Sequence, residues 1–221
     1  MPPNDFSAAR LAMVESQLRT NKVTHAGLLA GFLEIPRERF VPANLRGAAY
    51  VDEDLPLKPG RFLMEPMVLA RLLQLAEVTP DSRVLELGAA TGYVTAILSR
   101  LAKSVVAVEA DKTLSALAAP LLHELRCGNV TWVTGSPEQG HESKAPYDII
   151  LIDGAVSFIP DAVAAQLAEG GRLATIWREP GEPMGLAMLM TRIGSTLSRR
   201  PAFDAATPPL PGFAAAAAFV F

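Results

Sequence analysis

The residues best suited to chemistry form a glycine turn, Gly88-Ala89-Ala90-Thr91-Gly92, directly after the apolar run Val84–Leu87. Glycine at both ends of the turn allows a tight bend and a close approach of the backbone to a ligand. A dinucleotide-binding turn requires glycine at the first, third and sixth places, whereas here the third and sixth residues are Ala90 and Tyr93. The turn therefore favours a ligand other than a pyrophosphate.

Two acids accompany the turn. Glu86 stands two residues before Gly88, and Glu109 lies 21 residues beyond it, at the end of the next apolar run. That second spacing is about the one at which an acid accepts hydrogen bonds from ribose hydroxyls. The first acid would accept from a ligand's ammonium, directly or through water, while backbone N–H groups of the turn face its carboxylate. A nucleoside joined to an amino acid has all these groups, so the sequence predicts S-adenosyl-L-methionine, with S-adenosyl-L-homocysteine as its product. The alternative is a turn without a ligand, whose glycines serve packing.

A parallel sheet is needed to hold these residues at one edge. Short apolar runs alternate with helical stretches from residue 83 onward: the runs are 84–87, 105–108, 130–134, 149–152 and 173–177, and the helices 93–101, 114–125 and 160–167. Continuous β-branched and leucine runs are typical of strands buried on both faces. Their alternation with helices indicates right-handed crossovers and an α/β, doubly wound, mostly parallel sheet. Residues 184–193 and 214–221 are the expected closing strands, which makes seven.

The first 80 residues have a different character. Two short helical patterns, the second capped by Thr24, precede an irregular Pro-rich passage, and Pro66 is placed to begin a further helix. We expect residues 1–80 to form a helical extension and active-site lid. Residues 81–221 would form the cofactor-binding domain, and the two parts one structural unit.

The composition excludes several classes of protein. Half of the 221 residues are apolar, the formal net charge is −3, and there is one cysteine. These values rule out a disordered chain, a disulfide scaffold and a four-thiolate zinc site. The mild acidity gives no electrostatic footprint for nucleic acid, and the longest apolar stretch is too short to span a bilayer. We expect a cytoplasmic protein without a metal site.

Further landmarks lie outside the glycine turn: Met13-Val14-Glu15-Ser16-Gln17-Leu18, Ile35-Pro36-Arg37-Glu38-Arg39-Phe40-Val41-Pro42, Gly128-Asn129-Val130 and Leu167-Ala168-Glu169-Gly170-Gly171. With these the chain resembles the protein-L-isoaspartate (D-aspartate) O-methyltransferase family, roughly over residues 8–177. The resemblance implies a Rossmann-like class I methyltransferase fold and S-adenosyl-L-methionine as cofactor. It also implies methylation of a carboxylate, that of L-isoaspartyl residues in damaged proteins.

The chain departs from the family's pattern in the predicted lid. Family members usually carry Gln-Thr-Ile-Ser-Gln-Pro where this chain has Arg61-Phe62-Leu63-Met64-Glu65-Pro66. The hydroxyl residues that by resemblance hold the cofactor and the isoaspartyl carboxylate are thus replaced by Phe62 and Met64. The usual Gly-Asp-Gly after the third strand is Gly135-Ser136-Pro137, which removes an acid near the adenine. Two alternatives stay open: a methyltransferase with a different protein or small-molecule acceptor, and a cofactor-binding module without catalysis.

No general base is expected, because a carboxylate with a pKa of about 3.9 is already ionised near neutral pH and methyl transfer then requires mainly alignment. The candidates for lining the acceptor site are Arg61, Met64 and Asp153. The candidates for cofactor binding are Glu86, Gly88, Ala89, Ala90, Thr91, Gly92, Glu109, Ser136 and Asp153. The expected partner is a protein or peptide carboxylate, or a small molecule, and neither nucleic acid nor a membrane. The sequence does not define the oligomeric state.

Overall fold

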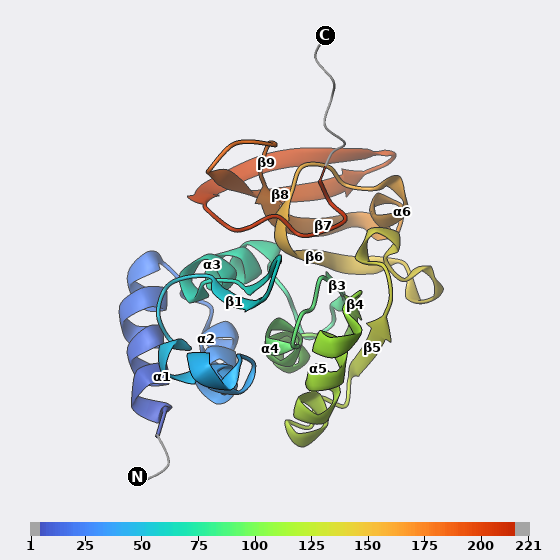
Figure 1. The fold of residues 1–221 in the computed structure, drawn as a ribbon. Coiled ribbons are helices and arrows are strands. Elements are labelled where there is room, and N and C mark those ends of the chain that lie inside the picture. Colours follow the sequence, from blue (N-terminus) through green and yellow to red (C-terminus); the bar gives the residue numbers. More distant parts are fainter. Residues whose placement is uncertain (1–4, 215–221) are drawn as a thin grey trace.

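The structure, a computed structural model, describes residues 5–214. Its centre is a seven-stranded sheet in the order β5-β4-β3-β6-β7-β8-β9 (Figure 1). The strands are β3 (Arg83–Leu87), β4 (Ser104–Glu109), β5 (Val130–Thr134), β6 (Tyr147–Val156), β7 (Leu167–Trp177), β8 (Gly185–Ile193) and β9 (Thr196–Ala205). The first five strands in this spatial order, β5, β4, β3, β6 and β7, are parallel to one another. Strand β8 pairs antiparallel with β7, and β9 pairs antiparallel with β8. The expected mostly parallel, seven-stranded α/β sheet is therefore confirmed.

The register of the central strands decides where a ligand can bind. Leu87, the last residue of β3, pairs with Val108 in β4 and with Ile152 in β6. The carboxyl ends of these three strands consequently lie at the same level. Open α/β sheets bind ligands at this edge, where the loops after the strands meet.

Helices cover mainly one face of the sheet. They are α2 (Ala26–Glu34), α3 (Pro66–Ala76), α4 (Tyr93–Leu101) and α5 (Lys112–Glu124), and their buried side chains share one core cluster with the strands. The opposite face is covered by α6 (Asp161–Ala164), by 3₁₀ turns and by residues 207–213, from which Leu210 and Phe213 are buried. The helix expected over 160–167 is this short because Leu167 already pairs with Tyr147 as the start of β7.

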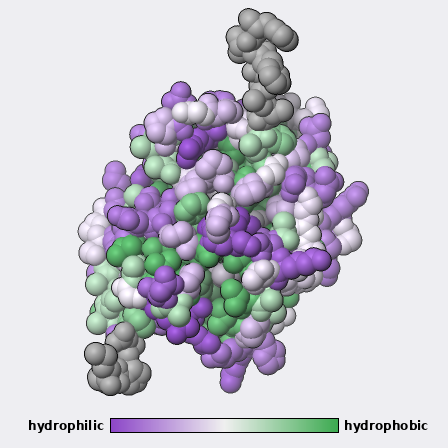
Figure 2. All heavy atoms as spheres, in the orientation of Figure 1, coloured by the Kyte–Doolittle hydropathy of each residue, from purple (hydrophilic) through white to green (hydrophobic). Residues whose placement is uncertain are grey.

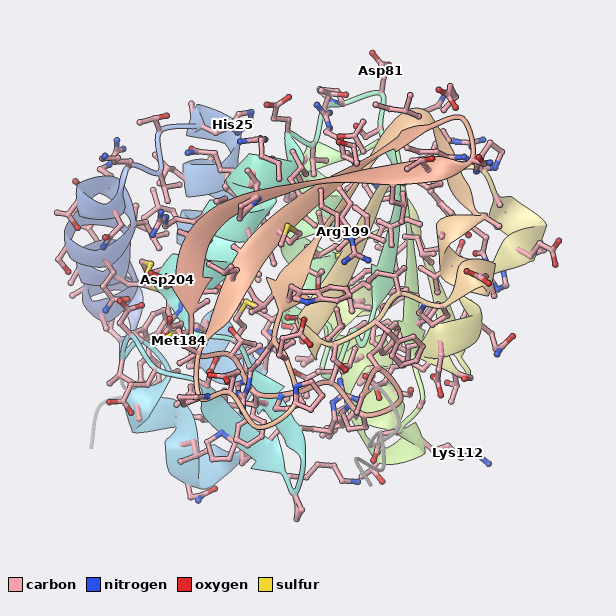
Figure 3. All side chains as sticks on the ribbon, turned by 90° about the horizontal axis from the view of Figure 1, so that it is seen from above. His25, Asp81, Lys112, Met184, Arg199 and Asp204 are labelled. Atoms are coloured by element: carbon pink, nitrogen blue, oxygen red, sulfur yellow. The ribbon has the colours of Figure 1, made fainter. Side chains whose placement is uncertain are left out.

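The N-terminal extension packs against the helical face. Helix α1 (Ser7–Met13) continues through π-helical and 3₁₀ turns at Val14–Leu18 and Arg19–Asn21. His25, and not Thr24 as expected, caps α2, since its Nδ1 accepts the N–H of Leu28 at 3.0 Å. Figure 3 shows this histidine on the extension, away from the hairpin of β8 and β9.

Two 3₁₀ turns and a small hairpin complete the extension: η3 (Arg37–Arg39), η4 (Ala43–Ala48), β1 (Leu55–Lys58) and β2 (Arg61–Leu63). The buried side chain of Arg37 ties them together. Its guanidinium donates to the backbone oxygens of Ala49 at 2.7 Å and Met64 at 2.8 Å, and lies 5.0 Å from the ring centroid of Tyr93. The extension is thereby fixed to the first residue of α4.

The C-terminal part contains a strand that local periodicity does not indicate. The expected strand 184–193 is β8, and β9 pairs with it in a long hairpin. The guanidinium of Arg199 in β9 lies 4.3 Å from the ring centroid of Trp177, and Figure 3 shows Arg199 near the middle of the hairpin. The expected strand at 214–221 falls, apart from residue 214, outside the described residues. No helix within residues 5–214 is long and apolar enough to cross a membrane.

Candidate functional site

The glycine turn lies at the carboxyl edge of β3 and is bound to the neighbouring strand. The N–H groups of Gly88 and Ala89 donate to the oxygen of Val108 at 2.9 and 3.1 Å. Three of the five turn residues have positive φ: +81° at Gly88, +50° at Ala90 and +88° at Gly92. Such a φ is uncommon for alanine. At Ala90 it directs the N–H group to Oε2 of Glu109, at 2.7 Å.

Glu109 is the most heavily bonded acid of the site. Its fully buried carboxylate accepts from the N–H groups of Ala90 and Asp111, the latter at 2.8 Å. It also accepts from both terminal nitrogens of Arg61, at 2.6 and 2.8 Å. One of these nitrogens, Nη2, lies 3.1 Å from the oxygen of Gly88 as well. Paired contacts between a guanidinium and a carboxylate are short and strong, so Arg61 is firmly held by the acid predicted to bind ribose.

Glu86 is fully buried beneath the turn. Its Oε2 accepts from the hydroxyl of Thr95 in α4 at 2.7 Å, and its Oε1 has no hydrogen-bond partner among the described residues. Burial raises the pKa of Glu86 well above its ordinary value, and the charges of Asp153 and Glu109 act in the same direction. Oε1 is thus left to accept from a ligand or a water molecule.

The three candidates for the acceptor site line one small cavity. It measures about 20 Å³, which is room for about one water molecule. Its lining residues are Asp54, Gly60, Arg61, Phe62, Met64, Asp153, Gly154, Thr207, Pro208, Pro209 and Leu210. Burial raises the pKa of Asp153 to about 7, although the nearby guanidinium of Arg61 opposes the shift. Burial also raises the pKa of Asp54.

Two other candidates lie apart from this cavity. The hydroxyl of Thr91 donates to the oxygen of Phe40 at 2.8 Å and so fastens the turn to the extension. Thr91 also lines a larger, mostly apolar groove of about 520 Å³ between η4 and α5; Figure 2 shows apolar atoms exposed among polar ones on this face. Ser136 is exposed beyond β5, the edge strand, and does not line the cavity.

The segment Thr207–Phe213 is part of the site and was not predicted from the sequence. The N–H of Leu210 donates to the oxygen of Ala155 at 2.8 Å, and the N–H of Ala155 donates to the oxygen of Pro208 at 3.0 Å. The segment thus follows the carboxyl end of β6 like a short extra strand. Its prolines and its lack of periodicity conceal this role, because the pairing depends on β6 and not on the segment's own pattern.

The polar groups of the site fit the predicted cofactor. Glu109 and the oxygen of Gly88 are acceptors at the ends of two adjacent strands, and ribose hydroxyls and an ammonium are donors. The free volume does not fit it, since small-molecule sites measure about 300–1,000 Å³ and the cavity here about 20 Å³. Among residues 5–214, no group of three or more His, Cys, Asp or Glu is placed to hold a metal ion.

Known proteins with similar sequences indicate one family. The family profile described as protein-L-isoaspartate(D-aspartate) O-methyltransferase matches residues 9–179. A protein-L-isoaspartate O-methyltransferase of Koribacter versatilis is 39% identical over 168 residues, covering 76% of each chain. The enzyme of that name from Roseiflexus castenholzii is 35% identical over 208 residues, covering 94% of each chain.

Two solved structures share the fold. A protein-L-isoaspartate O-methyltransferase superimposes with a TM-score of 0.80 at 25% identity, covering 92% of this chain and 66% of the other, longer chain. A Plasmodium falciparum protein assigned to the same activity, and solved with S-adenosyl-L-homocysteine, gives a TM-score of 0.76 at 18% identity. It covers 94% of this chain and 99% of the other. The fold and family expected from the resemblance are confirmed: the chain belongs to the protein-L-isoaspartate (D-aspartate) O-methyltransferase family, whose members are S-adenosyl-L-methionine-dependent O-methyltransferases.

Proposed function

We propose that this chain methylates a carboxylate of a protein or peptide, with the L-isoaspartyl side chain as acceptor and S-adenosyl-L-methionine as methyl donor. The observation that carries the proposal is the convergence of Glu109 and the Gly88 oxygen at the carboxyl ends of two paired strands. Family membership supports both the reaction class and the cofactor.

The cofactor side of the site would be built from the glycine turn and its two acids. When bound, the cofactor supplies an electrophilic methyl group on a sulfonium. Glu109 would bind the ribose hydroxyls, the turn residues 88–92 would bring backbone groups to the amino-acid end, and Oε1 of Glu86 would accept from the ammonium directly or through water. Asp153 and Ser136 belong to this side as further candidates.

The acceptor side would be the cavity next to Met64. An isoaspartyl carboxylate is ionised near neutral pH and needs orientation more than a base. Thr207 supports such a site, because its buried hydroxyl lines the cavity and its Oγ1 has no hydrogen-bond partner among the described residues. It offers a hydroxyl donor where Phe62 and Met64 have replaced those of the family.

A second candidate function is favoured by the acids of the same cavity. Asp54 and Asp153 both line it, and carboxylates that share a site repel one another. A neutral acceptor, such as a hydroxyl of another protein side chain or of a small molecule, avoids this repulsion. The pKa of Asp153, raised to about 7, suits a general base for such a hydroxyl.

A methyl-transfer assay distinguishes the two candidate functions. Calorimetry with S-adenosyl-L-homocysteine first establishes cofactor binding, and absence of binding contradicts both. Tritiated S-adenosyl-L-methionine is then offered with an isoaspartyl peptide and its normal aspartyl twin. Label on the isoaspartyl peptide alone supports the proposal, and Thr207→Val should then lower the rate for that peptide. Label on neither peptide, with binding intact, leaves a different acceptor or a module that only binds the cofactor.

Location and partners complete the proposal. We infer a cytoplasmic protein that meets its acceptor as a protein or peptide. The single cysteine, Cys127, is buried and forms no disulfide, which fits a reducing compartment.

A further inference from the structure

We propose that two side chains of the chain itself, Arg61 and Leu210, close the cofactor pocket in the resting protein, so that a nucleoside-linked amino acid binds only after both are displaced. This inference rests on the proposed cofactor and goes beyond it, because it assigns a closed state to the site.

Arg61 occupies the polar half of the pocket. Its two terminal nitrogens donate to both oxygens of Glu109, at 2.6 and 2.8 Å, and the second nitrogen also donates to the oxygen of Gly88 at 3.1 Å. A ligand with ribose hydroxyls and an ammonium needs these same acceptors. The side chain of Glu109 is 0% exposed and that of Arg61 10%, so little water is available to either ion if the pair opens without a replacement.

Leu210 occupies the apolar half. A Cβ atom added to Gly88 would lie 2.8 Å from both Cδ atoms of Leu210, and one added to Gly154 would lie 2.8 Å from its Cβ. The two glycines leave space beside the backbone through which a ligand could approach. Leu210 fills that space. The leucine is 3% exposed.

Both closing residues belong to segments at the edge of the sheet. Arg61 is the first residue of β2, directly after the turn at Gly60. Leu210 is held to β6 by the two backbone hydrogen bonds with Ala155, and the oxygen of Thr207 accepts from Nη1 of Arg178 at 3.0 Å. Neither residue belongs to β3, β4 or β6, so displacement of the two side chains leaves the pairing of these strands intact.

Closure has a measurable cost in affinity. A ligand that binds only the open state has an apparent dissociation constant equal to the intrinsic one divided by the open fraction. If the closed state dominates, a change that removes a closing contact and spares the ligand's own partners must tighten binding. Substitution of a residue that instead helps to hold the ligand must weaken binding.

The test is calorimetry with S-adenosyl-L-homocysteine on four full-length proteins: the natural chain, Arg61→Gln, Leu210→Ala and the double variant. Glutamine keeps much of the side chain's length but loses the charge and the paired geometry. We expect Arg61→Gln to bind about tenfold more tightly or better, Leu210→Ala also more tightly, and the double variant most tightly. Arg19→Gln removes the same charge from an exposed pair with Glu15 and should leave affinity unchanged.

A second measurement, by NMR, follows the guanidinium of Arg61 before and after ligand is added. In ¹⁵N-arginine spectra of the natural chain, the Nη–H₂ signals of Arg61, assigned by their loss in Arg61→Gln, should show restricted rotation and slow exchange. They should lose both on addition of S-adenosyl-L-homocysteine.

Equal or weaker binding by Arg61→Gln overturns the proposal, as does a freely rotating Arg61 guanidinium, and neither result affects the proposed function. If Leu210→Ala does not fold, as judged by circular dichroism, the Arg61→Gln comparison decides alone. Absence of binding in all four proteins overturns the closed-state proposal together with the proposed cofactor. Binding by all four without methyl transfer to any peptide contradicts only the proposed function.

Discussion

The guanidinium of Arg61 is paired with the carboxylate of Glu109, 48 residues further along the chain, through two hydrogen bonds of 2.6 and 2.8 Å. The pair joins the hairpin of β1 and β2 to the acid at the end of β4. Arg61 and a ligand therefore compete for the carboxylate of Glu109. The contribution of Glu109 to ligand affinity must for this reason be measured with the arginine side chain removed.

In the Arg61→Gln background, Glu109→Ala should weaken the affinity for S-adenosyl-L-homocysteine by roughly 1–3 kcal/mol, the usual cost of an unpaired buried hydrogen-bonding group. Calorimetry of the single and double variants measures the difference. Glu15→Gln, an exposed acid on α1's continuation, is the control and should leave affinity unchanged. An equal dissociation constant with and without the Glu109 carboxylate would refute its assignment to ribose.

Arg37→Met should lower the free energy of unfolding by about 2–4 kcal/mol. Methionine fills part of the volume but leaves the buried oxygens of Ala49 and Met64 without their donor. Urea unfolding followed by circular dichroism gives the value. The matched control is Arg39→Met, two residues away, whose exposed pair with Glu124 contributes under about 1 kcal/mol. Similar values for the two variants would contradict the structural role of Arg37.

Asp153→Asn should flatten the pH dependence of stability. The folded-state pKa of about 7 lies above the ordinary value of 3.8. Between these values the folded protein holds a proton that the unfolded chain has lost, so stability falls as the pH rises. Asparagine cannot ionise, and the variant should therefore gain about 2–3 kcal/mol relative to the natural chain between pH 5 and pH 8.

Urea unfolding at several pH values measures this gain. Asp161→Asn, on the short helix α6, is the control and should run parallel to the natural chain. A constant difference between Asp153→Asn and the natural chain from pH 5 to pH 8 would show that the buried carboxyl does not titrate in this range.

Gly88→Ala should destabilise the protein, and less so when Leu210 is absent. The new Cβ meets Leu210 at 2.8 Å, and the φ of +81° costs alanine about 1–2 kcal/mol by itself. A double-mutant cycle with Leu210→Ala should give a coupling energy of about 0.5 kcal/mol or more. Gly47→Ala, where no atom lies within 4 Å of the added Cβ, is the neutral control. Additive effects at 88 and 210 would mean that the two residues do not touch.

The regular elements were largely predictable because local patterns specify them. Helix α4 and strand β5 have the expected bounds, Tyr93–Leu101 and Val130–Thr134. Helix α3 begins at Pro66, since proline fits the first helical position without losing a hydrogen bond. Strand β9 was missed, because its outward residues are polar and its register is set by β8.

The edge of the sheet that carries the candidate site could be predicted, but the side-chain contacts made there could not. The spacing of Glu109 from Gly88 follows from one strand–helix–strand unit, so the sequence places both at the same edge. Arg61, a candidate for lining the acceptor site, also bonds to Glu109, and the sequence does not indicate that contact. Long-range pairs of this kind depend on how the hairpin packs, and no local pattern encodes that.

The sequence by itself determined the family, through landmarks spread along the chain. It also determined the alternation of strands and helices from β3 to β7 and the acids and glycines at the carboxyl edge, because each of these depends on neighbours within about one turn or one crossover. Only the tertiary structure decided which groups fill that edge. Leu210 reaches Gly88 from 122 positions away in the chain, through a segment whose pairing with β6 exists only once the sheet has formed. Closure of the site is therefore a property of the packed molecule, decided by the shape and charge complementarity of segments that meet only in the fold.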